Sequence, residues 1–501
     1  MNKILDIILV ILSSALMGLS QQPINLGFLS LFALVPILHL LCKLKDYREA
    51  IKIGLIWGIV FNTSSIFWIS QNIGTSPLIA FSTMLLAVFI LTTIPVMVFI
   101  VWCRLNRRGI SIFFLSFIWP SIEFIRSFGS LAFPWVSLSN SLIEYHLIIQ
   151  SAEYIGMYGM TFWVVLVNIM IYQSVTSRKK FILLLTLVII TLPSLMGNKI
   201  IQSNHSIKSN PIRVASIQPN VHLSEKWSDG AQRHIVTKII SQTKLEFTSD
   251  GKNNPDLVVW PETSTISYIL KENNRYNYNR LKSLLKDKDT KLIAGIPHYE
   301  YKDKQINYFN SAGYFDSSGL LGLYHKINLV PGAEYVPLSN YIRSLDILNI
   351  GIGNFTNGKE FTLFNLKSYK IATMICFESV FPGLSREFVR KGANLLVYIV
   401  NDGWYESAPE PQQHASRAIY RAIETRRPVV RCANTGISMV IDEFGNIQHQ
   451  IGLNKKGTIS AEVYPTSKMT FYVKYGDIFI YFMIAVTIIF MFRGLRYEEY
   501  I

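Results

Sequence analysis

Three polar residues stand directly after short apolar runs in the second half of the chain. Glu262 ends the run 257–262, Lys326 ends the segment 323–326, and Cys376 ends the run 371–376. Short apolar runs bounded by polar residues are typical of buried strands. In open α/β sheets, ligands and catalytic groups gather at the carboxyl ends of the strands. These three residues are therefore the first candidates for chemistry.

The three side chains also complement one another chemically. A thiol acts as a nucleophile only as the thiolate, and a carboxylate within reach can accept its proton. An ammonium group beside both lowers the thiol pKa and can stabilise the oxyanion of a tetrahedral intermediate. Taken singly, Glu262 reads as a cap or turn residue, Lys326 as a solvated side chain and Cys376 as a small buried hydrophobe. Only the combination, in this order, favours catalysis.

Other catalytic and metal-binding patterns are missing from the sequence. The nine histidines form no H-E-x-x-H pattern, and there is no G-x-S-x-G elbow or Walker loop. The four cysteines form no C-x-x-C pair, which excludes a disulfide framework and gives no Cys/His metal site. We therefore expect neither a metal nor another cofactor.

The candidate residues lie in a block of ordinary globular composition that follows residue 203. Alternating apolar runs and helical patterns predict an α/β fold there. The predicted strands are 212–217, 257–260, 291–296, 308–315, 370–375, 395–400 and 429–431 continuing through 436–442. The predicted helices are 229–247, 274–285, 383–391 and 411–425, and the polar segment 200–210 is the predicted linker.

The first 200 residues have a different composition. They hold only 13 Lys/Arg and 6 Asp/Glu, although the whole chain is 16% charged and carries a net charge of +15. Eight apolar segments approach the length that a membrane span needs. They are 4–19, 26–42, 53–69, 78–102, 110–124, 157–173, 181–195 and, near the C-terminus, 478–492. The first could also be read as a signal peptide, but no small-x-small cleavage site follows it, so an uncleaved helix is favoured.

Basic residues occur in every second loop between these segments. The basic loops contain Lys43, Lys45, Arg48 and Lys52, then Arg104, Arg107 and Arg108, then Arg178, Lys179 and Lys180. Basic loops remain in the cytoplasm, so both chain ends are predicted inside and the block from 203 to about 474 outside. Much of the positive charge is thus a topology signal, and without any nucleic-acid-binding motif we expect no nucleic-acid partner. The remaining excess of positive charge, in the block predicted outside, favours either binding to an anionic lipid surface or simply solubility.

The three candidates and their flanking motifs resemble a known family. The order Pro261-Glu262, Tyr324-His325-Lys326 and Cys376-Phe377-Glu378 is similar to the Glu–Lys–Cys triad of the nitrilase/amidase superfamily, whose fold is an αββα sandwich. Seven apolar segments before this block and one after it match the apolipoprotein N-acyltransferase branch. The resemblance covers nearly the whole chain and is strongest at 259–263, 331–337 and 401–404.

The resemblance implies a reaction and a place for it. Cys376 would be the nucleophile, Glu262 the general base and Lys326 the oxyanion stabiliser. The acyl chain of a phospholipid would pass through a Cys thioester, in ping-pong order, to the α-amine of the diacylglyceryl-cysteine of an apolipoprotein. The enzyme would be a monomer in the bacterial inner membrane, multi-pass, with its catalytic domain in the periplasm.

It also implies auxiliary residues. Glu334 would be an additional essential acid and Glu378 a supporting carboxylate, which could instead be a helix N-terminal charge. Trp227 is similar to the tryptophan of a mobile arm over the site, or it could be an interfacial anchor. Asn310 is similar to an asparagine that supports the triad. Phe377 stands where many members have Tyr, which leaves the backbone N–H in place but removes a hydroxyl.

The expected organisation is therefore a multi-pass α-helical membrane domain with an extracytoplasmic nitrilase-like αββα sandwich. The expected domains are a seven-helix domain at 1–199, a catalytic domain at 200–474, and a last helix with a short cytoplasmic tail at 475–501. Two alternatives remain from other classes. One is a membrane-tethered amidase or hydrolase that releases its product to water. The other is a transporter, for which charged residues such as Glu123, Arg126 and Glu153 would face a cavity.

Overall fold

The computed structural model describes residues 3–203, 209–226, 230–248, 251, 253–302, 304–337, 354–405, 407 and 409–493. The chain forms two compact units. The first contains Met1–Gln71, Pro77–Asn204 and Tyr475–Ile501, and the second contains Asn72–Ser76 and His205–Lys474.

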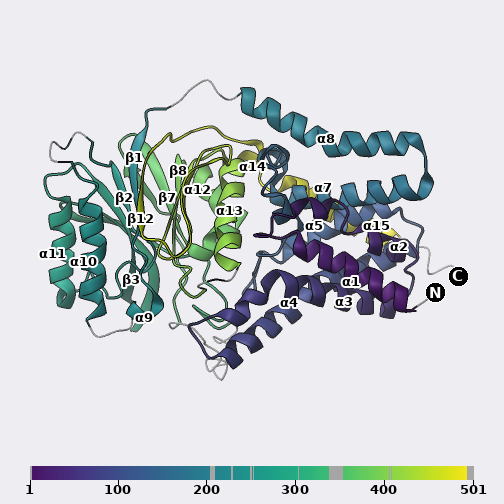
Figure 1. Cartoon of the computed structure of the whole chain (residues 1–501), viewed down its shortest axis with the longest axis horizontal. Helices are drawn as coiled ribbons and strands as arrows, with labels where there is room; N and C mark the ends of the chain where they lie inside the picture. The colour runs from purple at the N-terminus through teal and green to yellow at the C-terminus, as the bar shows by residue number, and fades with distance from the viewer. Residues whose placement is uncertain are drawn as a thin grey trace. The chain divides into compact units, whose positions relative to one another are not determined.

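The first unit is entirely helical where it is described (Figure 1). Its elements are α1 (Lys3–Leu19), η1 (Gly27–Leu31), α2 (Val35–Leu41), α3 (Tyr47–Ile66), η2 (Phe67–Gln71), α4 (Pro77–Asn106), η3 (Ile112–Phe114), α5 (Leu115–Ile125), η4 (Leu138–Leu142), α6 (His146–Ile149), α7 (Ala152–Ser177), α8 (Lys180–Ser203) and α15 (Ile478–Arg493). Four helical stretches, 47–71, 77–106, 152–177 and 180–203, are long and apolar enough to cross a membrane. Three of the other predicted spans correspond to shorter apolar helices, at 4–19, 112–125 and 478–492.

Two details differ from the sequence predictions. Residues 26–42 do not form one helix, because the chain leaves η1 and begins α2 near Pro36. Asn168 of α7 stabilises this break: its Oδ1 accepts from Leu34 N at 2.8 Å and its Nδ2 donates to Ser30 O at 2.7 Å. The predicted linker 200–210 is also wrong in its first residues, since α8 continues to Ser203.

The second unit contains two six-stranded sheets. The first has the order β12-β1-β2-β3-β4-β5, formed by β1 (Ile212–Gln218), β2 (Leu257–Val259), β3 (Lys291–Lys302), β4 (Gln305–Asp316), β5 (Gly319–His325) and β12 (Gly457–Val463). The second has the order β11-β10-β9-β8-β7-β6, formed by β6 (Leu363–Leu366), β7 (Tyr369–Ile375), β8 (Leu395–Val400), β9 (Val429–Ala433), β10 (Ser438–Ile441) and β11 (Ile447–Ile451). In each sheet three neighbouring strands are parallel, β1–β2–β3 and β7–β8–β9.

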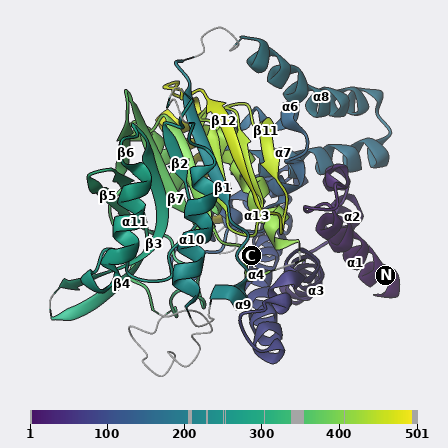
Figure 2. The same cartoon turned by 60° about the vertical axis from the view of Figure 1, so that its left-hand side comes forward.

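Helices cover the outer face of each sheet. Helices α10 (Ala231–Lys244) and α11 (Arg275–Leu285) lie on one side of the paired sheets, and α12 (Pro382–Arg390) and α13 (Glu410–Thr425) lie on the other (Figure 1). In Figure 2 the first pair comes forward over β1, β2 and β3. Apolar residues of α10 and α11, among them Ile239 and Leu285, pack on Val258 and Ala294 of the sheet, and all four are fully buried. The predicted αββα sandwich is confirmed.

The sequence identified most of the buried strands and missed the less apolar ones. The run 429–442, predicted to continue as one strand, is two antiparallel strands, β9 and β10, separated by a turn at 434–437. Strand β5 was missed because two glycines interrupt its apolar pattern. Strand β11 was missed because its side chains are almost all exposed. The short helices α9 (Leu223–Lys226) and α14 (Phe471–Tyr475) and the 3₁₀ helix η7 (Cys376–Val380) complete the described elements used below.

Candidate active site

The three residues singled out from the sequence lie at the ends of strands from both sheets. Glu262 follows β2 and Lys326 follows β5, both of the first sheet, whereas Cys376 follows β7 of the second sheet. Glu262 is 6% exposed and Lys326 is 1% exposed, while Cys376 is partly buried. Two sheets packed face to face thus bring together residues that are more than 100 positions apart in the chain.

The three side chains are within interaction distance. The Lys326 Nζ lies 3.7 Å from Glu262 Oε1, and the Cys376 thiol forms a hydrogen bond with the Glu262 carboxylate. The carboxylate is therefore placed to accept the thiol proton, with the ammonium beside the same pair. This is the arrangement that thiolate formation requires.

A second carboxylate completes the charge cluster. Glu334 contacts Lys326 Nζ through both oxygens at 2.9 Å, and its Oε2 also accepts from Val330 N at 2.8 Å. Asn310 Nδ2 donates to Glu262 Oε1 at 2.7 Å and to Glu334 Oε1 at 2.9 Å. The Asn310 amide therefore joins the two acids, both of which also contact the lysine.

The pKa values of the triad shift in directions that suit a resting thiol. Burial, and then the Glu262 carboxylate, raise the pKa of Cys376 well above its usual value, although Lys326 opposes this. Burial also raises the pKa of Glu262, against the lowering effect of Lys326. Burial alone would lower the pKa of Lys326, but Glu334 and then Glu262 raise it, so the ammonium stays charged. The site therefore rests as a neutral thiol beside a fixed positive charge.

The backbone of Cys376 has an unusual conformation that a buried network supports. Its φ is +54°, a left-handed value that non-glycine residues rarely adopt. His414 of α13 contacts the Cys376 carbonyl oxygen through Nε2 at 3.0 Å and Asp402 Oδ1 through Nδ1 at 2.8 Å. Arg431 Nη2 donates to the other Asp402 oxygen at 2.9 Å. This network supports the backbone of Cys376. The sequence analysis did not predict the contact from His414, because its partner on Cys376 is a main-chain atom.

Electrostatics keep the Asp402 carboxylate ionised. Burial would raise the pKa of Asp402, but Arg431 and then His414 lower it to about 2. Cys376, Asp402 and His414 also lie close enough together to hold a metal ion. Both ring nitrogens of His414 are already used by Asp402 and the Cys376 carbonyl, so the histidine is not available as a ligand in this arrangement.

Glu378 links the two strands that carry Lys326 and Cys376. It is fully buried, and one of its oxygens accepts from Tyr324 Oη at 2.7 Å, Ile327 N at 2.7 Å and Asn328 N at 3.1 Å. Its other oxygen accepts from Ile375 N at 2.7 Å. Burial raises the pKa of Glu378 to about 7, although these hydrogen bonds lower it. Glu378 is therefore a buried bridge between the sheets, and its contact with Ile375 N also places its charge at the N-terminus of the 3₁₀ helix η7.

The remaining predicted residues have different outcomes. Phe377 is buried and packs edge-on against Phe381 at a ring distance of 5.2 Å. Trp227 lies outside the described residues.

Lys226, the neighbour of Trp227 in the chain, is 6% exposed and donates to Thr263 Oγ1 at 2.9 Å. Burial lowers the pKa of Lys226 to about 8, and the nearby Glu262 opposes this shift. Lys226 is thus a second buried amine near Glu262, and the sequence analysis did not single it out.

The second unit also includes a short segment from the first part of the chain. Ile73 N donates to Trp404 O at 3.0 Å, and Asn72 Nδ2 donates to Tyr405 Oη at 3.4 Å. A Cβ on Gly74 would lie 2.3 Å from the Trp404 ring, so only glycine fits there. The segment Asn72–Ser76 therefore closes on the loop that contains Asp402.

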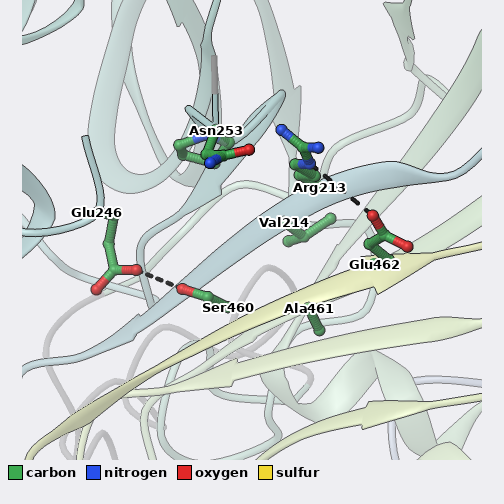
Figure 3. Close-up of a pocket in the computed structure, with 8 residues that line it drawn as sticks. Arg213, Val214, Glu246, Asn253, Ser460, Ala461 and Glu462 are labelled. Atoms are coloured by element: carbon green, nitrogen blue, oxygen red, sulfur yellow. Dashed lines mark hydrogen bonds and ion pairs between the residues drawn. The ribbon is translucent and has the colours of Figure 1, made fainter. Parts of the chain in front are cut away.

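A separate surface hollow lies at the outer end of β1 and β12 (Figure 3). Arg213 Nε lies 3.9 Å from Glu462 Oε1 across it, and Ser460 donates to Glu246 on its other side. None of the triad residues lines this hollow. Its paired charges are typical of a solvated surface, and we assign no chemistry to it.

Sequence comparisons agree with this geometry. Residues 213–467 match the family model described as carbon-nitrogen hydrolase, and residues 13–170 match the model described as apolipoprotein N-acyltransferase N-terminal domain. A Saccharomyces cerevisiae nitrilase-superfamily structure, Nit3, is 20% identical over 52% of this chain and 92% of its own, with a TM-score of 0.39. The match of the family model over residues 213–467 shows that the second unit is of the carbon-nitrogen hydrolase class.

Full-length relatives narrow the assignment further. An apolipoprotein N-acyltransferase from Geobacter metallireducens is 32% identical, over 96% of this chain and 93% of its own length. Those from Chlorobaculum tepidum and Thermotoga maritima are 27% and 26% identical, over 94% and 99% of this chain and 93% and 96% of their own lengths. The chain belongs to the apolipoprotein N-acyltransferase family, and it is an N-acyltransferase and a membrane protein.

Proposed function

We propose that this enzyme transfers an acyl chain from a phospholipid to the α-amine of the N-terminal diacylglyceryl-cysteine of apolipoproteins. The observation that carries the proposal is the convergence of Cys376, Glu262 and Lys326 in a chain that also has long apolar helices. Lipid and lipid-anchored acceptor would then meet the triad at the membrane surface.

In the first half of the reaction the enzyme becomes acylated. Glu262 accepts the proton of Cys376 Sγ, and the thiolate attacks the ester carbonyl carbon of the phospholipid. The negative charge moves to the carbonyl oxygen, where Lys326 Nζ stabilises it. The C–O bond to the glycerol breaks, the leaving alkoxide takes the proton from Glu262, and a lysophospholipid departs. A thioester on Cys376 remains.

In the second half the acceptor amine enters. Its nitrogen attacks the thioester carbonyl, the same ammonium stabilises the oxyanion, and Glu262 accepts a proton from the amine. The C–S bond breaks, an amide forms, and the proton returns to the sulfur. Asn310 and Glu334 keep Glu262 and Lys326 in place through both halves. Water has to be excluded meanwhile, because it would hydrolyse the thioester.

We place the enzyme in the bacterial inner membrane as a monomer, with the catalytic unit on the periplasmic side. The alternation of basic and uncharged loops supports this orientation. The domains would be a membrane domain at 1–199, a catalytic domain at 200–474 and a final membrane helix at 475–501. The proposed reaction needs no metal, other cofactor or nucleic acid, because the thioester stores enough free energy for amide formation.

The transfer itself can be measured with purified protein in detergent. A phospholipid labelled in its acyl chain is incubated with enzyme and a diacylglyceryl-cysteine peptide. The label is expected in an amide on the peptide, and Cys376→Ser should abolish this product while Cys432→Ser, a change at a buried cysteine outside the triad, should retain it. Release of the label as free fatty acid, with none on the peptide, would favour the hydrolase alternative.

The transporter alternative finds less support. Glu123 is buried in α5, where it accepts hydrogen bonds from Leu138 N at 3.1 Å and Thr161 Oγ1 at 2.9 Å, and from Ser137. Arg126 donates to the Val136 carbonyl. These contacts account for both charges as packing between α5, α7 and the intervening loop.

A further inference from the structure

Two histidines and a glutamate from separate strands lie together on the first sheet. His298 and Glu300 are on β3, and His325 is on β5; both strands pair with β4. One donor atom from each residue lies within 4.8 Å of the other two. Glu300 Oε1 is 3.4 Å from His325 Nε2 and 3.8 Å from His298 Nε2.

This cluster lies on the sheet face opposite the catalytic residues. Ile296 is part of the core beneath α10 and α11, and side chains two residues apart on a strand share a face, so His298 and Glu300 point to that side. Ser311 is the register partner of both Ile296 and His325, which places His325 there as well. The next residue after His325 is Lys326, which faces the triad. The end of β5 therefore contributes His325 to the cluster on one face of the sheet and Lys326 to the triad on the other.

The imidazole of His325 is held in a fixed orientation. Its Nδ1 lies 2.7 Å from Ser311 Oγ, and the Phe309 ring stacks on it at 4.2 Å. When Nδ1–H donates to the serine oxygen, Nε2 faces the Glu300 carboxylate at 3.4 Å, where a bound ion would take the place of a proton between the two groups. Metal-binding histidines commonly donate a hydrogen bond from their second ring N–H in this way. The His298 and His325 rings are nearly parallel, at 9°, with centroids 5.5 Å apart.

The charges around the two imidazoles favour a bound cation. The carboxylates of Glu300 and Glu360 lie near His325, and the ammonium of Lys271 lies near His298. Two carboxylates against one ammonium leave a net negative charge around the two histidines.

We infer that His298, Glu300 and His325 form a binding site for a divalent transition-metal ion, with Zn²⁺ the best match. Two imidazoles and one carboxylate, with water as a fourth ligand, are a common zinc set, whereas Mg²⁺ and Ca²⁺ prefer oxygen donors. Tetrahedral zinc with bonds of about 2.0–2.2 Å separates its donors by about 3.3 Å. The 3.4 Å separation between Glu300 and His325 already fits. Rotation of Glu300, whose side chain is 47% exposed, can shorten its 3.8 Å separation from His298 Nε2, and a shift of the His298 ring would bring its nitrogen closer to that of His325.

The bound ion would join β3 to β5 across β4, one residue before Lys326. Its role is to stabilise this end of the sheet, not to take part in acyl transfer. The three ligands come from positions 298, 300 and 325, a spacing that matches no zinc motif, so the sequence alone gave no indication of the site.

The test is calorimetric titration of full-length, chelator-treated protein in detergent with ZnCl₂. All proteins carry Cys376→Ser, which removes the catalytic thiol as a competing ligand. One Zn²⁺ per chain is expected to bind, and MgCl₂ is expected to give no binding. His298→Gln and Glu300→Gln should each weaken zinc binding at least tenfold, whereas His449→Gln, a change at an exposed histidine of β11, should leave it unchanged.

Thermal unfolding gives a second readout with the same proteins. Zinc should raise the midpoint of the parent protein but not that of Glu300→Gln, and the two should unfold at similar temperatures without metal because Glu300 is half exposed. Absence of zinc binding to the parent protein would overturn the assignment. Binding of equal affinity in the parent, His298→Gln and Glu300→Gln would place the ion elsewhere and overturn it too.

Discussion

Replacement of His414 by Ala tests whether the buried network positions the nucleophile. His414 Nε2 contacts the Cys376 carbonyl at 3.0 Å, and its Nδ1 contacts Asp402 at 2.8 Å. The variant loses both contacts and leaves a buried carbonyl without this partner, which costs about 1–3 kcal/mol of stability. Asp402 keeps its ion pair with Arg431, so the fold should persist.

The effect on the reaction should exceed the effect on the fold. Cys376 holds a left-handed φ of +54°, and without His414 its backbone can relax and shift the sulfur. A misplacement of about 1 Å can cost about 100-fold in rate. We therefore expect about a 100-fold slower acylation of Cys376, with KM for the phospholipid nearly unchanged, since His414 is placed to contact the enzyme's own backbone.

The assay is the single-turnover rate of Cys376 acylation by labelled phospholipid, measured beside urea unfolding. His234→Ala, at an exposed histidine of α10, is the matched control and should behave as the parent protein. Acylation of folded His414→Ala at the parent rate would refute the positioning role. A rise in KM alone would refute it as well, because it would indicate a substrate contact.

Three further predictions concern the base, the oxyanion stabiliser and the segment at Trp404. Acylation should be lost as the pH falls through the pKa of Glu262, which is raised above the usual value of about 4.3, because only the carboxylate can accept the thiol proton. A pH–rate profile that stays flat down to pH 4.5 would contradict this. Lys326→Met should slow acylation about 100- to 1,000-fold and also destabilise the fold by about 3–5 kcal/mol, because Glu334 loses its buried partner. Single-turnover rates measure the first effect and urea unfolding measures the second. Acylation within tenfold of the parent rate would rule out the oxyanion role. Gly74→Ala should destabilise the protein by about 1–3 kcal/mol in urea unfolding, because the new methyl group meets the Trp404 ring, and an unchanged midpoint would show that the contact is not made in solution.

The sequence was informative where chemistry and burial coincide. Glu262 and Cys376 could be recognised because each ends a fully buried strand, and periodicity alone marks such strands. Lys326 could be recognised only beside these two, since its own strand, β5, has two glycines and no clear alternation. The resemblance to a known family then supplied Glu334 and Asn310, whose spacing carries no signal of its own.

The parts that could not be predicted depend on contacts between distant segments. His414 acts on a backbone carbonyl, and Asp402 and Arg431 meet it only after the second sheet has formed. The break between η1 and α2 is stabilised by Asn168, more than 120 residues away in the chain. Hydropathy measures composition along the sequence and contains no information about contacts between distant residues. It therefore located the apolar segment 26–42 but not its interruption.

Intact-protein mass spectrometry after incubation with a defined phospholipid, without acceptor, tests the central claim most directly. The account predicts one added acyl mass on Cys376, removed by neutral hydroxylamine and by a diacylglyceryl-cysteine peptide, and absent from Cys376→Ser and Glu262→Gln. A folded parent protein that transfers acyl chains without ever carrying this mass, or that carries it equally in Cys376→Ser, would contradict the account.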